Sequence, residues 1–213
     1  MKKIAQTLGM ALMAALLMIG TPAEAQTRQQ KKDAKKEAKR LQKEGFQTMG
    51  LPIQRQLEDF YVKISERDDE GMPMYLMATN QAVGNSYAAA QMEATNIAKV
   101  RLAGQVQTMV MSQAKADLAN STMSADEAAS ITKVLEKSTL MVAQKLNRVI
   151  VAQEYYRVLQ NKNYEVHVVL LYSSKAVREM VLQDAKKLLQ EELDNFTPEH
   201  EKILAGICNN GIK

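Results

Sequence analysis

The sequence predicts an α+β fold, with a small three-stranded antiparallel sheet and long helices packed on one of its faces. Two observations lead to this prediction. Apolar residues recur every three or four positions along two long stretches that a polar break separates, as in amphipathic helices. The period then shortens to two over a pair of β-rich stretches joined by a polar turn, as in a hairpin.

Length and composition set the first limits on function. A chain of 213 residues, 46% hydrophobic and 24% charged, is sufficient for one globular domain with extensions. The net charge of +4 is too small for the basic face of a nucleic-acid-binding domain, so we expect no nucleic-acid partner. Cys208 is the single cysteine, which excludes an intramolecular disulfide.

Residues 1–25 have the pattern of a secretory signal peptide. Two lysines precede an apolar run that ends near Gly20, and Ala23 and Ala25 supply the small residues of a cleavage site. Cleavage after Ala25 gives an exported chain without a transmembrane segment, located in the periplasm or associated with the outer membrane or cell surface. The alternative is a retained anchor, in which case the positive charges after the run would hold the rest in the cytoplasm.

Residues 26–50 are expected to form a basic arm, helical or disordered. Residues 26–44 hold eight basic and three acidic residues, a net charge of +5. One interpretation is a solvated, partly helical spacer. The other is docking to an anionic surface, such as lipid headgroups or acidic glycans, which salt would weaken. The basic residues are Arg28, Lys31, Lys32, Lys35, Lys36, Lys39, Arg40 and Lys43.

The α+β domain is expected over residues 51–195, after a boundary that contains two glycines and a proline. Apolar residues at helical spacing predict a short helix over residues 53–66. A charged turn follows, and residues 74–83 suit a strand.

Two long helices come next. Ser86 can cap the first, an Ala-rich segment over residues 87–118. Gly104 inside it costs about 1 kcal/mol relative to alanine, so a close crossing by another element would explain its presence. Ser124 and Glu127 form a capping box that begins the second helix. The short polar turn between the two helices requires them to lie antiparallel and to bury their apolar faces.

The hairpin comprises residues 149–159 and 164–172. A last helix follows to about Leu193, and residues 196–213 form a short C-terminal tail with a helix start at Thr197-Pro198. Alternation in the second strand of the hairpin places one set of residues on the core face, namely Tyr164, Val166, Val168, Leu170 and Tyr172.

We find no catalytic, cofactor-binding or metal-ligating set and therefore expect no cofactor and no metal. His167 and His200 are distant in sequence, and Cys208 lies in the tail. Zinc spacing, a nucleophile elbow and a phosphate-binding glycine loop are absent from the sequence. Glu154 and Glu165 could approach across the hairpin near His167, which we expect to be exposed on the strand face opposite the core.

Two stretches carry a resemblance to a known family. They are YLMATNQAVGNSYAAAQMEATNIAKVRLAGQVQT and RVIVAQEYYRVLQNKNYEVHVVLLYSSKAVREM. Their pattern of strand, Ala-rich helix, second helix and Tyr-x-Val-x-Val strand resembles the LPP-twenty lipoproteins and is similar to the N-terminal domain of the flagellar assembly protein FlgT. It is closer still to uncharacterised exported proteins of Gram-negative gut bacteria. The resemblance implies an α+β envelope domain without known catalysis, although the lipid-bearing cysteine of the lipoproteins is missing here.

These observations favour a non-enzymatic exported envelope protein that acts through protein or envelope-surface contacts. Its partner would be an envelope protein of unknown identity or an anionic envelope surface. Two alternatives remain at this stage. One is binding to an anionic lipid or glycan surface through the basic arm, and the other is a hydrolase whose site is not recognisable from sequence.

Overall fold

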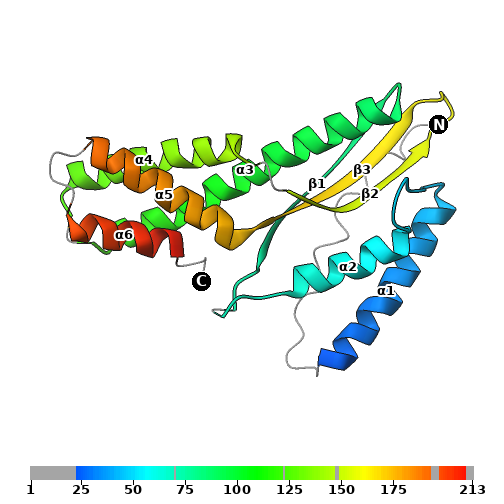
Figure 1. Cartoon of the computed structure of the whole chain (residues 1–213), viewed down its shortest axis with the longest axis horizontal. Helices are drawn as coiled ribbons and strands as arrows, with labels where there is room; N and C mark the ends of the chain where they lie inside the picture. Colours follow the sequence, from blue (N-terminus) through cyan, green and yellow to red (C-terminus); the bar gives the residue numbers. More distant parts are fainter. Residues whose placement is uncertain (1–22, 70, 122, 147–148, 193–196, 210–213) are drawn as a thin grey trace, which may run out of the picture.

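The computed structural model describes residues 23–69, 71–121, 123–146, 149–192 and 197–209 and confirms the α+β prediction (Figure 1). The predicted signal peptide lies outside the described residues, apart from its last three positions. The elements in chain order are α1 (Ala23–Lys43), α2 (Ile53–Ser65), β1 (Tyr75–Gly84), α3 (Tyr87–Ala119), α4 (Ala125–Gln144), β2 (Ile150–Val158), β3 (Tyr164–Ser173), α5 (Ser174–Glu192) and α6 (Pro198–Asn209).

The sheet has the order β1-β3-β2, and both pairs are antiparallel. Asn161 and Lys162 form the tight turn between β2 and β3, where Lys162 has a φ of 64° and the side chain of Asn161 accepts a hydrogen bond from the backbone N–H of Asn163. A bulge at Ala152 shifts the register of β2 against β3. Because β3 is the central strand, its side chains can be covered on both faces of the sheet.

The main core lies on the face of β3 that the alternation predicts. The residues Val166, Val168 and Leu170 are fully buried there beneath α3. Alanines dominate the first half of α3, including Ala90 and Ala94, and their small size lets the helix lie close to the sheet.

Helix α3 joins the sheet to a second group of helices. Its 33 residues correspond to about 50 Å at 1.5 Å per residue, so it extends well past the sheet. Its far half packs with α4 and α6, and α5 packs in turn on these two helices (Figure 1). The predicted capping box is present at the start of α4, with Ser124 and Glu127 each bonding the other's backbone N–H.

The C-terminal segment is more than a tail, because residues 198–209 form α6. Its buried residues Leu204, Ile207 and Cys208 belong to the main core. Thr197 and His200 begin this helix together, since Nδ1 of His200 accepts a hydrogen bond of 3.1 Å from the backbone N–H of Thr197.

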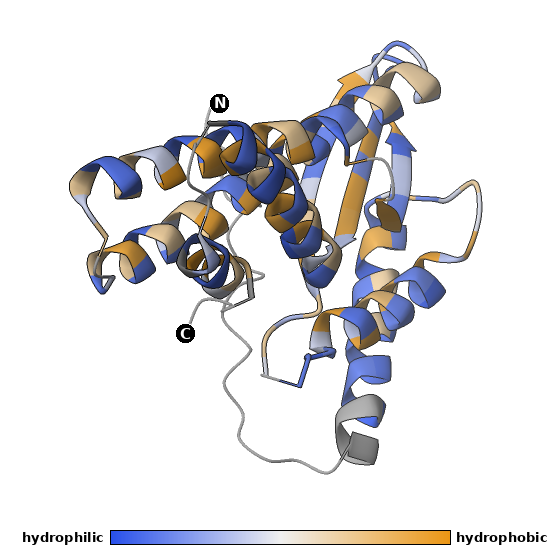
Figure 2. Ribbon diagram, turned by 60° about the vertical axis from the view of Figure 1, so that its left-hand side comes forward, coloured by the Kyte–Doolittle hydropathy of each residue, from blue (hydrophilic) through white to orange (hydrophobic). Residues whose placement is uncertain are grey.

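The opposite face of the sheet is covered by α2. Phe60 packs on Val169 and Leu171, so β3 is buried on both sides and α2 adds a layer that the sequence prediction did not include. Helix α1 then packs on α2 (Figure 1). Figure 2 shows the hydrophobic colours concentrated in the sheet and on the inner sides of the helices, whereas α1, at the lower right, is mainly hydrophilic.

Both edges of the sheet are partly covered, β1 by side chains of α3 and β2 by a backbone bridge. On β1, the carbonyl oxygens of Met77 and Thr79 accept hydrogen bonds from Gln105 (2.9 Å) and Arg101 (2.5 Å) of α3. On β2, Gln47 pairs with Tyr156 in an antiparallel bridge. Covered edges are protected against pairing with another chain.

None of the helices in the described part of the chain combines the length and the apolar composition that a bilayer-spanning helix needs.

Candidate functional site

Helix α1 is an integral part of the folded protein, and the expectation of a solvated spacer is wrong for this segment. Its Ala34, Ala38 and Leu41 are at most 3% exposed. They form a small core with Leu57 of α2 and Tyr155 of β2. These three residues form only a narrow apolar stripe along α1. Because two of them are alanines, α1 and α2 can approach closely, and the stripe is fully buried despite its small area.

The end of α1 is fixed by a Schellman motif. Gly45 has a φ of +86°, a conformation that glycine adopts without steric cost. Its N–H bonds the carbonyl of Gln42 at 3.1 Å, and the N–H of Phe46 bonds the carbonyl of Leu41 at 3.0 Å. The following residue, Gln47, exchanges two backbone hydrogen bonds of 2.8 Å with Tyr156. The helix is therefore held to the sheet at its C-terminal end.

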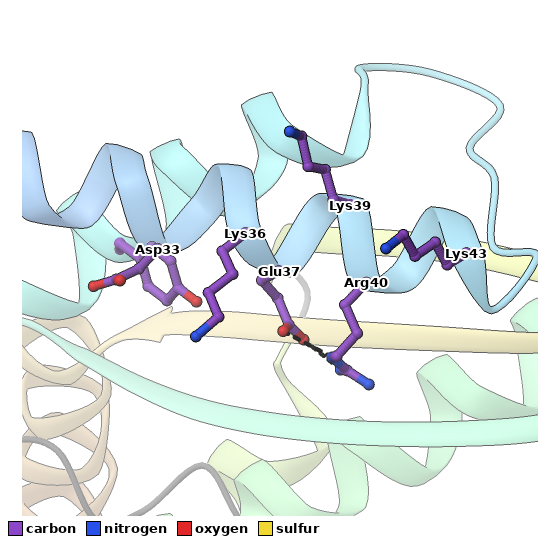
Figure 3. A pocket seen from close by; sticks show the side chains of 7 residues that line it. Asp33, Lys36, Glu37, Lys39, Arg40 and Lys43 are labelled. Atoms are coloured by element: carbon purple, nitrogen blue, oxygen red, sulfur yellow. Dashed lines mark hydrogen bonds and ion pairs between the residues drawn. The ribbon is translucent and has the colours of Figure 1, made fainter.

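Asp33 and Glu37 of α1 lie on one flank of the helix and already have partners. Arg40 forms ion pairs with Glu37 and with Glu44, the latter at 2.5 Å. Asp33 accepts a hydrogen bond of 3.0 Å from Gln29. Figure 3 shows Asp33, Glu37 and Arg40 on this flank and Lys39 on the other.

The remaining basic residues of α1 are exposed and, within the described residues, form no ion pair with a carboxylate. Helical spacing gathers most of them on the side opposite the buried stripe. We call this set the basic row. Its members follow one another at intervals of four, four, three and four residues, namely Arg28, Lys32, Lys36, Lys39 and Lys43, with Lys31 and Lys35 beside them.

The basic row is about 22 Å long, because it covers fifteen residue steps of 1.5 Å each. A shallow hollow of about 530 Å³ lies beside the C-terminal half of the row (Figure 3). Lys36, Lys39 and Lys43 line this hollow together with the acidic flank and Tyr61. The site is thus an open, positively charged strip with carboxylates along one side.

This arrangement destabilises the helix. Among the seven basic residues of α1 that form no ion pair within the described residues, five pairs are spaced four residues apart, and each such pair costs about 0.2–0.5 kcal/mol, or about 1–2.5 kcal/mol in total. A surface helix with no binding role would gain stability from acids interspersed at these positions. Local rules are typically violated where a surface has a function. The pairs are Arg28/Lys32, Lys31/Lys35, Lys32/Lys36, Lys35/Lys39 and Lys39/Lys43.

The residues considered for a hydrolase are not brought together. Glu154 points to the α3 side of the sheet, where it accepts hydrogen bonds from the hydroxyl of Tyr87 and from Gln91 (3.0 Å). Glu165 lies on the opposite face, 7% exposed, and pairs with Arg157 at 2.7 Å. The antiparallel register separates the two carboxylates by the thickness of the sheet.

His167 is partly buried rather than exposed. Its ring stacks on Tyr155, and its Nε2 lies 3.2 Å from the hydroxyl of Thr79, whereas its buried Nδ1 has no hydrogen-bond partner among the described residues. Burial lowers the pKa of His167 to about 4, with nearby Glu165 acting in the opposite direction. The ring is therefore neutral near pH 7.

The other candidates for chemistry are part of the core. Cys208 is 1% exposed, and burial raises the pKa of its thiol to about 12, which suppresses the nucleophilic thiolate. His200 is also buried, at the start of α6. In the part of the chain that the structure describes, no three His, Cys, Asp or Glu side chains are placed to hold a metal ion.

A second hollow, of about 310 Å³, lies between α2 and the first residues of β2 and was not foreseen from the sequence. Exposed apolar side chains line it, including Met49, Leu51 and Val151. The sequence does contain the two short apolar segments that line this hollow, residues 49–51 and 150–152, but no sequence pattern indicates that they lie side by side.

No family model, curated protein or solved structure matches this chain.

Proposed function

We propose that the protein is exported and attaches to an anionic surface of the cell envelope through the basic row of α1, acting by contact rather than catalysis. The observation that carries the proposal is the segregation of charge on α1. Within the described residues, seven cations of α1 are exposed without a carboxylate partner, while Asp33 and Glu37 have partners on one flank.

Rigid presentation of the cations supports the proposal. A disordered basic arm would lose conformational freedom on binding, which reduces affinity. Here Leu41 and the Schellman motif at Gly45 fix the helix to the domain before any ligand arrives. The positive charges are thus preorganised, and binding orders only the lysine side chains.

Export is supported by the sequence pattern of residues 1–25 and by the resemblance to envelope proteins. The proposal requires a mature N-terminus at Gln26. Mass spectrometry of the protein recovered from fractionated cells tests this point. An intact Met1 on protein from the cytosol or inner membrane would contradict it.

The binding proposal is tested by neutralising the row without removing the helix. Deletion of α1 is unsuitable, because it would uncover Leu57 and Tyr155. The test variant instead carries Gln at Lys32, Lys36, Lys39 and Lys43. A matched control with the same change in net charge carries Gln at exposed lysines of α3, α4 and α5, namely Lys115, Lys133, Lys175 and Lys187.

Each lysine near an anionic surface contributes about 1 kcal/mol, so the row variant should bind about a hundredfold or more weakly. Co-sedimentation with phosphatidylglycerol vesicles and with an insoluble acidic polysaccharide measures this loss. The control variant should sediment like the wild type with at least one of the two. Equal binding of the row variant and the control would refute the role of α1.

A further inference from the structure

We propose that the ligand of the basic row is a linear acidic glycan that lies along α1, rather than a lipid bilayer. This inference rests on the proposed function and narrows its ligand to one chemical class. Three features of α1 support it: the long and narrow shape of the row, the burial of the apolar side of the helix within the protein, and the predominance of lysine over arginine.

The positive strip is long and narrow. It extends for about 22 Å along the helix axis. Asp33 and Glu37 line the same hollow as Lys36, so carboxylates border the strip along that side. A flat anionic membrane would bring its headgroups close to these carboxylates as well as to the lysines. A single extended chain of uronic acids can follow the cations and comes close to the carboxylates only beside Lys36, which Figure 3 shows on the same flank as Asp33 and Glu37.

The apolar side of α1 is not free to enter a bilayer. Helices that lie in a membrane interface bury a broad apolar face among the acyl chains. In α1 that side consists of Ala34, Ala38 and Leu41, and all three are already buried in the protein. The exposed Met49 and Leu51 line the separate hollow between α2 and β2. The basic row therefore offers charge without insertion.

Lysine predominates in the row, with Arg28 as its only arginine. Arginine binds phosphate and carboxylate groups through a rigid, bidentate fork, whereas lysine is a hydrated point charge on a flexible stem. Regularly spaced lysines suit a polymer with regularly repeating carboxylates, because the polymer can shift along the row by one repeat and still pair its carboxylates with lysines. Such binding is weak for each unit and grows with the number of units engaged.

The test compares ligands of one chemistry and different length. Binding of the wild-type protein, the row variant and the matched control is measured by isothermal titration with galacturonate monomer and with oligogalacturonates of increasing length. Phosphatidylglycerol vesicles form a separate arm. We expect no measurable binding of the monomer and an affinity that rises at least a hundredfold with length, until the oligomer spans the row.

The row variant should lose at least tenfold of the affinity for the longest oligomer, and the control should keep it. Raising the salt concentration from 50 to 200 mM should weaken this binding by roughly ten- to a hundredfold. Binding to vesicles without binding to oligomers would overturn the glycan assignment and leave the proposed function standing. Binding of neither ligand would overturn both.

Discussion

Tyr155 and His167 stack across the β2–β3 pair, with ring centroids 4.7 Å apart and ring planes inclined by 13°. Tyr155 also belongs to the small core under α1. The histidine ring therefore lies one side chain away from the helix that carries the basic row, and its protonation state should affect how firmly α1 and α2 are held to the sheet.

The first prediction is an acid-dependent loss of stability through His167. Its pKa is about 4 in the folded protein, compared with 6.5 for an ordinary histidine in an unfolded chain. As the pH falls, the unfolded chain therefore protonates His167 before the folded protein does. The contribution of the neutral ring to the free energy of unfolding is fully present above pH 6.5 and is lost as the pH falls towards 4. The decline amounts to about 3 kcal/mol. Urea unfolding of the wild type and His167→Gln at several pH values isolates it. Parallel pH dependence of the two proteins would contradict the prediction.

The second prediction concerns the hydrogen bond from Tyr87 to Glu154, which ties the start of α3 to β2. Burial, with the bond to this carboxylate, raises the pKa of Tyr87 above its usual value. Tyr87→Phe keeps the packing on Tyr156, where the ring centroids are 5.0 Å apart, and removes only the donor. We expect a loss of about 1–2 kcal/mol in thermal or urea unfolding. Tyr164→Phe, whose hydroxyl forms no hydrogen bond within the described residues, serves as the control and should change stability little.

The third prediction uses two glycines of the β1–α3 unit. A Cβ at Gly84 would lie 2.8 Å from the backbone nitrogen of Ala90, whereas a Cβ at Gly104 would meet nothing within 4 Å. Gly84→Ala should therefore destabilise the protein by about 1–3 kcal/mol. Gly104→Ala should stabilise it by about 1 kcal/mol. Urea unfolding of both variants measures the two effects, and a cost at position 104 would contradict the structure.

The same glycines show where sequence reasoning ends. A close approach was expected at Gly104, and the expectation is wrong; it occurs at Gly84 instead. Helical periodicity identifies the face of α3 that is buried but not which element lies over each turn. Position 104 is simply on the exposed side of the helix. Tertiary contacts between distant segments decide such cases, and single-sequence patterns do not contain them.

β3 and α1 repeat this lesson in two forms. The alternation in β3 correctly predicts its core face, yet the unbroken apolar run from Val168 to Leu171 also indicates burial on both faces, which α2 provides. In α1 the stripe that includes Ala34 and Leu41 was recognisable in the sequence. Its burial was not, because three small contacts become a core only after α2 folds back against them.

The fourth prediction tests whether α1 is integral to the domain. Leu41→Ala removes most of the side chain from the small core and should lower the local stability of α1 by about 2–3 kcal/mol. Hydrogen exchange should accelerate in residues 28–43 and stay slow in α3. Leu140, which is 56% exposed, gives a matched control, and Leu140→Ala should leave exchange unchanged. Fast exchange of α1 already in the wild type would restore the spacer interpretation.

The last prediction separates a functional charge arrangement from an ordinary solvated helix. Lys35 takes part in two of the like-charged pairs, with Lys31 and Lys39. Lys35→Glu turns both into opposite-charge pairs and should stabilise α1 by about 1–2 kcal/mol. It also places a carboxylate beside the basic row, so binding to an anionic ligand should weaken. Stability by urea unfolding should thus rise while affinity by isothermal titration falls, because the like charges that favour binding destabilise the helix.

Lys187→Glu on α5 makes the same change in net charge and should leave the affinity unaltered. A Lys35→Glu protein that is more stable and binds as well as the wild type would mean that the lysines of α1 only solvate the helix.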